Sequence, residues 1–257
     1  MTTGLYLAPL VTFSFVLARV GGLVVTAPLL SFGALPWKLR LFLAIALALV
    51  VTPIELSAPP VIPPNLPVYA IQLAGELLIG ALLGVGVMVL VAGAQLAGQI
   101  ISQMSGLSVA DAFNPAFDEE APVLANLLQM TALAVFVAIG GHRLLVGALL
   151  DTYTAMPPGR AELLSSVGKL VPSLLAESFS LAVRGAVPAI VAVLLATISL
   201  GLISRTLPQM NIMAIGFGLN VLVTLGILAL SIGGIAWLFQ EQLEPAVETV
   251  LAALRPI

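Results

Sequence analysis

The feature that most constrains this chain is the length of its uncharged stretches. Only 8% of the 257 residues are charged, whereas 60% are hydrophobic. In an ordinary soluble domain about a quarter of the residues are charged. A soluble fold of this size could not cover its surface with the few charged residues of this chain. The long uncharged stretches include Val20–Trp37, Leu41–Ile54, Leu77–Ala110, Ala121–Gly141, Gly185–Ser204 and Thr206–Gln240. Because a spanning helix needs about 20 mostly apolar residues, the sequence predicts an all-α, multi-helix integral membrane protein built of long apolar helical hairpins.

Composition also excludes several classes of function. Nine scattered basic residues and a net charge of −3 leave no footprint for nucleic acid. The absence of cysteine rules out disulfides, thiolate metal sites and cysteine nucleophiles. A single histidine, His142, argues against histidine-based catalysis or metal binding. We therefore expect no catalytic residue, no metal site and no cofactor, and a protein that is not an enzyme.

Three helices are predicted in the N-terminal part. We expect them at about Leu5–Leu30, Trp37–Val51 and Val68–Met104. Six prolines between Pro53 and Pro67 predict an extended, solvated connector between the second and third helices.

The third helix is too long for a simple span. It would measure about 55 Å, far more than the hydrocarbon core of about 30 Å, and Thr206–Gln240 raises the same difficulty. Either these segments break at glycines, or they belong to something taller than a bilayer. The glycines in question are Gly84, Gly86, Gly216 and Gly218.

A polar stripe marks the end of the third predicted helix. Gln95, Gln99 and Gln103 repeat every four residues and therefore share one face. The stripe could line a water-filled path for a transported molecule. It could equally form hydrogen bonds between packed helices.

Four charged residues lie within or at the ends of apolar segments: Arg19, Glu76, Arg184 and Arg205. A charge at the bilayer centre costs roughly 2.5–3.5 kcal/mol on insertion scales, so each needs a partner, an interface or a wet cavity. Structural pairing is favoured over a proton or ion relay, because no acid–base chain with helical spacing is visible. For His142, a satisfied histidine near a helix end is favoured over a pH switch.

The segment Ser105–Pro122 combines helix breakers, acidic residues and two phenylalanines. Gly106, Pro115 and Pro122 predict a loop. An acidic surface loop has little reason to carry Phe113 and Phe117, so they are expected to insert elsewhere. In a pore mouth they would form an apolar constriction; alternatively, the loop docks on its own helix ends.

The C-terminal tail is predicted to be amphipathic. Leu243, Val247, Val250 and Leu254 share one face of Glu241–Leu254, and glutamates lie off it. Without a basic face, a membrane surface is disfavoured, and a partner helix is the better interpretation.

Four blocks of sequence resemble the FliR family, whose members are export-gate subunits of the flagellar type III secretion system. The blocks stand in the family's order along nearly the whole chain. They are FVLARVGGLVVTAPLLSFGALPWKLRLFLAIALALVVTP (Phe15–Pro53), QMSGLSVADAFNP (Gln103–Pro115), GGHRLLVGAL (Gly140–Leu149) and RTLPQMNIMAIGFGLNVLV (Arg205–Val223). Injectisome subunits of the SctT type share the architecture, but the third and fourth blocks favour the flagellar branch. The signature positions are Gly141, His142, Arg205, Pro208, Gln209 and Asn211.

The resemblance implies an architecture and partners. It implies a single FliR-like subunit over residues 1–257, with a FliP-like part (1–184), a FliQ-like helical hairpin (185–240) and the amphipathic tail (241–257). One copy would join several FliP-like and FliQ-like subunits in a closed, helical pore assembly, together with an FlhB-like switch protein and an FlhA-like export protein. That assembly would stand in the bacterial inner membrane, at the flagellum basal body, in contact with lipid and with unfolded protein substrates but not with nucleic acid.

The resemblance also implies a function for the central loop. In the family this loop plugs the pore, which here assigns Gly106, Phe113, Asn114 and Pro115 to the gate within the loop 105–122. Phe117 is assigned there too, although Ala116–Glu120 stands where family members usually have a Ser-Gly pair.

Two other classes of protein fit the sequence less well than an export-gate subunit. A small-solute transporter should show inverted repeats around a midplane site, and a membrane enzyme needs clustered polar catalytic groups.

Overall fold

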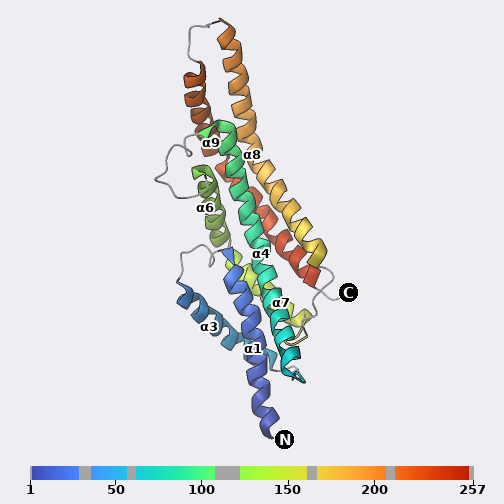
Figure 1. Cartoon of the computed structure of the whole chain (residues 1–257). Coiled ribbons are helices and arrows are strands. Elements are labelled where there is room, and N and C mark those ends of the chain that lie inside the picture. The colour runs from blue at the N-terminus through green and yellow to red at the C-terminus, as the bar shows by residue number, and fades with distance from the viewer. Residues whose placement is uncertain are drawn as a thin grey trace. The chain divides into compact units, whose positions relative to one another are not determined.

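The computed structural model describes residues 2–28, 36–56, 62–107, 122–160, 167–206 and 212–254. Every regular element in these ranges is a helix, as the all-α prediction requires (Figure 1). The helices are α1 (Thr2–Thr26), α3 (Trp37–Glu55), α4 (Leu66–Ser105), α6 (Val123–Ala138), α7 (Gly141–Ala155), α8 (Val167–Thr206) and α9 (Ile212–Leu254). Within these ranges, five helices are long and apolar enough to cross a membrane, or six if α6 and α7 count as one broken span.

The long helices do not break at the glycines that the sequence offered as break points. Helix α4 continues through Gly84 and Gly86 for 40 residues, and α9 continues through Gly216 and Gly218 for 43 residues. At about 1.5 Å per residue, α4 is about 60 Å long, twice the thickness of a hydrocarbon core. A glycine inside a helix costs only about 1 kcal/mol, whereas an unpaired backbone group in an apolar environment costs several. Breakage was therefore the wrong explanation.

The proline-rich connector is shorter than predicted. Pro53 lies in the last turn of α3, which ends at Glu55, and Pro67 is the second residue of α4. A proline in the first turn of a helix removes no intrahelical hydrogen bond, because that N–H has no helical partner. This reason accounts for Pro67, whereas Pro53 removes one hydrogen bond within the last turn of α3 and leaves the earlier turns intact. The prediction of an extended segment was therefore wrong at both ends of the range.

The chain forms two compact units. The first comprises residues 1–89, 140–175 and 243–257, and the second comprises residues 90–139 and 176–242. Helices α4, α8 and α9 each contribute residues to both units. Neither unit is continuous in sequence, because the chain leaves each one and returns to it.

In the first unit, glycines bring α1 and α4 into backbone contact. A Cβ atom on Gly22 would overlap the carbonyl oxygen of Leu77, and one on Gly80 would overlap the carbonyl oxygen of Arg19. The Thr26 hydroxyl donates a hydrogen bond to the carbonyl of Ala81 at 3.1 Å. Small residues permit such close helix approach in membrane proteins, where packing replaces the hydrophobic effect.

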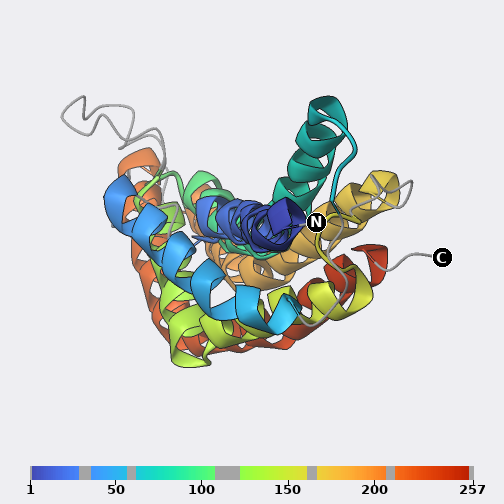
Figure 2. The same cartoon turned by 90° about the horizontal axis from the view of Figure 1, so that it is seen from below.

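Helix α3 crosses α1 obliquely, as Figure 2 shows with α1 seen nearly end-on. One face of α3 is buried, and its residues recur at helical spacing: Ala44, Ala48, Val51 and Thr52. The other face carries large apolar side chains that are exposed.

The amphipathic tail is the last part of α9 and not a separate element. Its apolar face, Leu243, Val247, Val250 and Leu254, is buried in the first unit. A Cβ atom on Gly86 of α4 would lie 2.6 Å from a methyl group of Val250. At Val250, the helix partner of this face is therefore the chain's own α4.

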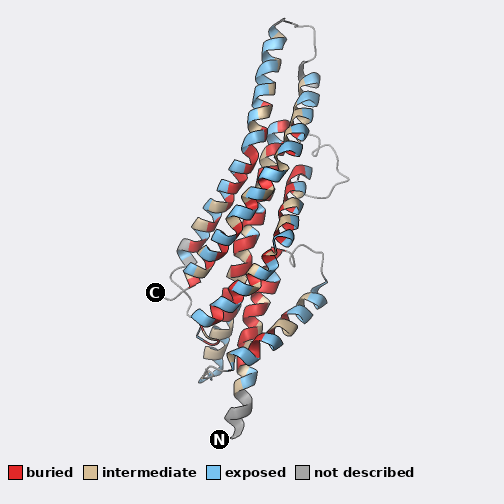
Figure 3. Ribbon diagram, turned by 180° about the vertical axis from the view of Figure 1, so that it is seen from behind, coloured by how far each residue is buried: buried red, intermediate tan, exposed pale blue. Residues whose placement is uncertain are grey.

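In the second unit, residues from α4, α6, α8 and α9 form one apolar core. Its buried members are Ala97, Ile101, Leu124, Leu128, Ala186, Ala189, Leu228 and Ile235. Beyond this core, the end of α8 and the start of α9 are exposed over most of their surface (Figure 3). These exposed side chains are mainly leucine, isoleucine and valine, so this part of the hairpin is suited to lipid or to partner helices and not to water.

The close approach of α1 to α4 gives a matched pair of glycines for a test. Gly22→Ala should destabilise the chain, because the added methyl group meets the α4 backbone. Gly21→Ala, at the adjacent position, should be neutral or slightly stabilising, since nothing lies within 4 Å of its Cβ position and alanine is the better helix former. Thermal unfolding of both purified variants in detergent measures the difference. Equal unfolding temperatures would contradict the backbone contact.

Candidate functional site

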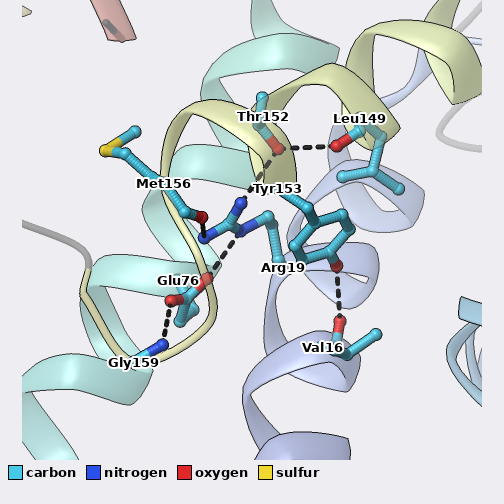
Figure 4. A network of polar contacts seen from close by, with 8 residues as sticks. All are labelled: Val16, Arg19, Glu76, Leu149, Thr152, Tyr153, Met156 and Gly159. Atoms are coloured by element: carbon cyan, nitrogen blue, oxygen red, sulfur yellow. Dashed lines mark hydrogen bonds and ion pairs between the residues drawn. The ribbon is translucent and has the colours of Figure 1, made fainter. Parts of the chain in front are cut away.

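A fully buried ion pair lies at the centre of the first unit. The Arg19 Nε of α1 donates to Glu76 Oε2 of α4 at 2.6 Å, and both side chains are 0% exposed (Figure 4). The two residues are the charges that the sequence singled out as needing partners within the N-terminal helices. Each is the partner of the other, as structural pairing predicts.

Helix α7 and the turn after it complete the surroundings of the guanidinium. Arg19 Nη1 donates to the Thr152 hydroxyl at 3.0 Å, and Nη2 donates to the carbonyl of Met156 at 3.0 Å. The guanidinium carbon lies 4.3 Å from the ring centroid of Tyr153, a cation–π contact. Since a buried charge is costly unless it is paired and hydrogen-bonded, these contacts explain how α1 accommodates an arginine.

The Glu76 carboxylate also holds the turn that follows α7. Its second oxygen, Oε1, accepts a hydrogen bond from the Gly159 N–H at 2.8 Å. Gly159 has a φ of 82°, a conformation that favours glycine. Nearby, the Tyr153 hydroxyl donates to the carbonyl of Val16 at 3.3 Å. The pair therefore fixes α1, α4, α7 and the turn at residues 156–159 to one another.

This arrangement is built for structure and not for proton transfer. Both carboxylate oxygens and all three guanidinium nitrogens have protein partners. A relay needs a group that exchanges protons with a neighbour or with water, and neither side chain has access to solvent.

The two other charges that the sequence singled out in apolar segments, Arg184 and Arg205, are exposed. Arg184 Nη2 lies 4.0 Å from Glu241 Oε2, with both side chains about half exposed (51% and 48%). Exposed pairs of this kind contribute about 0–1 kcal/mol. Arg205 is exposed in the last turn of α8, where a positive charge complements the helix dipole. Arg184 therefore has a partner, as expected, whereas the interface expected for Arg205 stays a prediction.

Of the predicted gate residues, Gly106 alone lies within the described part of the chain; Phe113, Asn114, Pro115 and Phe117 lie outside it. Gly106 ends α4 with a φ of 80°, and its N–H donates to the carbonyl of Gln103 at 3.3 Å. A Cβ atom there would lie 3.6 Å from the Phe217 ring of α9. The predicted end of the helix at this glycine is confirmed.

The Gly-His block forms the break between α6 and α7. Gly140 has a φ of 77°, and its carbonyl accepts from the Arg143 N–H at 2.8 Å, opening α7. Gly141 is buried, whereas His142 is exposed. The signature residues Pro208, Gln209 and Asn211 lie outside the described residues.

The glutamine stripe lies on the part of α4 that belongs to the second unit. Gln95 and Gln99 are half-buried, and Gln103 is exposed. Within the described ranges, none of the three side chains has a hydrogen bond. The three residues do share one helical face, but whether this face lines a path stays a prediction.

The described residues contain no apparent metal site, and one small cavity lies near the ion pair. No group of three or more histidine, aspartate or glutamate side chains there is placed to hold a metal ion. A cavity of about 250 Å³ lies beside the ion pair, between the end of α7 and the end of α9. It is lined by Asp151, Thr152, Thr154, Ala155, Met156, Leu251 and Leu254. Its volume is below the roughly 300–1,000 Å³ typical of small-molecule sites.

Sequence reasoning identified Arg19 and Glu76 but missed their neighbours. The two charges are 57 positions apart, and no periodicity links them. Thr152 and Tyr153 look like ordinary helix residues, and their role follows only from the fold. Gly159 stands in the MPPGR segment, whose turn chemistry was visible, although its contact with Glu76 was not.

Removing one member of the pair should be far more damaging than breaking the exposed pair. Glu76→Ala leaves a buried guanidinium without a counter-charge and should cost about 3–5 kcal/mol. Glu241→Ala, the matched control, should cost no more than about 1 kcal/mol. Thermal unfolding in detergent measures the loss of stability in both variants. The readout is the fraction of protein that stays monodisperse as the temperature rises.

A double variant separates charge from packing. Arg19→Met with Glu76→Met should be more stable than Glu76→Ala alone, because no uncompensated charge remains. A double variant no better than the single one would show that the hydrogen bonds to the turn, and not the charge balance, dominate.

Comparison with known proteins shows the family to which the chain belongs. Residues 10–246 match the family model for bacterial export proteins, family 1. The flagellar biosynthetic protein FliR of Caulobacter vibrioides is 32% identical over 89% of this chain and 91% of its own length. FliR of Escherichia coli is 33% identical over 89% of this chain and 87% of its own length. FliR of Aquifex aeolicus is 26% identical over 87% and 86%. The chain therefore belongs to the bacterial export proteins, family 1, and to the FliR proteins within that family.

Proposed function

We propose that this chain is a structural subunit of the flagellar type III protein export gate. In this role it forms part of the membrane pore through which unfolded flagellar proteins leave the cell during flagellum assembly, and it catalyses no reaction. The observation that carries the proposal is the match to flagellar biosynthetic FliR proteins along about nine tenths of the chain. The chain is a multi-pass protein of the bacterial inner membrane, with five long apolar helices among its described residues.

We further propose that the gate is a hetero-oligomer. One copy of this chain would assemble with several FliP-like and FliQ-like subunits and would bind an FlhB-like switch protein and an FlhA-like export protein. The exposed apolar surface of α8 and α9 supports the need for partners, since side chains such as Leu202, Leu222 and Leu230 are 63–83% exposed. Residues 1–184 would take the FliP-like place and residues 185–240 the FliQ-like place in the assembly.

The central loop is proposed as the plug. Gly106 follows the last residue of α4 and lies at the start of the loop 105–122, which supports a plug that begins where the helix ends. Phe113 is the bulky residue proposed to close the pore, with Asn114, Pro115 and Phe117 beside it.

The glutamine stripe is proposed to face the export path. Gln95, Gln99 and Gln103 carry no charge, so they would hydrate a path without trapping a passing chain. Their partial exposure, and the lack of hydrogen bonds to neighbouring helices in the described ranges, support this proposal over interhelical bonding.

Native mass spectrometry of the assembled gate tests the proposed function. The tagged full chain is co-expressed with the FliP-like and FliQ-like proteins of the same organism. We expect a complex with one copy of this chain and several copies of each partner. A stable chain that binds neither partner and forms only monomers or homo-oligomers would contradict the gate assignment.

Deleting Gly106–Pro115 tests the plug. If this segment closes the pore, the deletion should make cells leak small ions while the gate still assembles. Membrane conductance reports the leak, and mass spectrometry of the same variant confirms assembly. An assembled gate with unchanged ion permeability would refute the plug, and replacing only Phe113 with alanine should give a smaller leak.

A further inference from the structure

Helix α3 presents an apolar face that no part of the described chain covers. Its outward side chains Leu39, Phe42, Leu49, Val50 and Ile54 are 52–72% exposed, while the opposite face packs inside the first unit (Figure 3). A row of this kind along one helix cannot be left in water. Lipid acyl chains are available to a multi-pass membrane protein, and they require only an apolar surface.

The beginning of α3 has the composition of a membrane boundary. Trp37 is 68% exposed, and Lys38 is exposed and has no ion-pair partner among the described residues. Lys38 and Phe42 are four residues apart and so lie on the same face. Tryptophan and lysine are enriched at the level of the lipid headgroups, where an apolar body and a polar tip can both be satisfied.

The apolar stretch that follows this boundary is too short to span a bilayer by itself. Leu41–Ile54 contains 14 uncharged residues and is about 21 Å long, shorter than a hydrocarbon core of about 30 Å. In a bilayer, Lys38 must therefore extend its ammonium toward the surface along its own aliphatic stem. The positive charge at this end meets the negative surface of anionic phospholipids, which attract basic residues next to a span.

We infer that the start of α3 is an anionic-lipid contact, with Trp37 at the headgroup boundary and Lys38 bound to lipid phosphate. The outward row from Leu39 to Ile54 then lies against acyl chains. This inference concerns the membrane and does not depend on the export-gate proposal.

Tryptophan fluorescence tests the depth. The chain has two tryptophans, so Trp237→Phe leaves Trp37 as the single reporter. In nanodiscs of the full chain, phospholipids brominated near the headgroup end of the acyl chain should quench Trp37 more strongly than those brominated near the chain terminus. No quenching at either depth would overturn the inference, as would stronger quenching by the deep bromines.

The lipid class is tested by native mass spectrometry. Phosphatidylglycerol should be retained in preference to phosphatidylcholine, and Lys38→Gln should reduce that retention roughly fivefold, the factor for about 1 kcal/mol per basic residue. Inorganic phosphate should not compete. Arg143→Gln, which removes another exposed positive charge, is the matched control and should leave retention unchanged.

Two further outcomes are decisive. Equal losses in Lys38→Gln and Arg143→Gln would show a general effect of net charge and overturn the specific contact. Quenching of Trp37 should persist in the complex co-expressed with gate subunits. Its loss there would assign this face to a protein partner and overturn the lipid contact.

Discussion

In an apolar environment, a charged side chain that is cut off from water must find its counter-charge within the protein. Arg19 meets this requirement through Glu76, and the first unit is organised around the pair. Three helices and one turn each contribute a hydrogen bond or ring contact to it. Apolar packing alone would allow α1, α4 and α7 to meet in several ways. The cost of leaving either charge unpaired selects the one arrangement in which Arg19 meets Glu76.

Close helix contact is the second constraint, and it depends on glycine. Between segments that are already in lipid, apolar area adds little to association, so helices associate by approaching closely. Gly22 and Gly80 bring the backbones of α1 and α4 together where Arg19 must reach Glu76. The same glycines that make a helix weaker by propensity therefore make the ion pair possible.

The exposed parts of the molecule are as informative as its core. The α8–α9 hairpin and the outward face of α3 are both apolar and exposed, but they differ in extent. Helix α3 begins with an aromatic and a basic residue suited to lipid headgroups, whereas the hairpin exposes apolar side chains over most of its surface. The surface of α3 is thus suited to a bilayer boundary, and the surface of the hairpin is suited to lipid or to partner helices.

The sequence alone determined the all-α membrane class, the starts of α3 and α4 to within two residues, the helix end at Gly106 and the membership of the FliR family. Those properties follow from local composition, turn chemistry and ordered motifs. It also showed that Arg19 and Glu76 needed partners, but it could not join them, since residues 57 positions apart meet only when the helices pack. Whether long helices break at glycine, and what covers the tail of α9, were likewise decided by tertiary structure. A helix breaks or continues, and an apolar face is buried or exposed, according to which backbone and side chains lie against it.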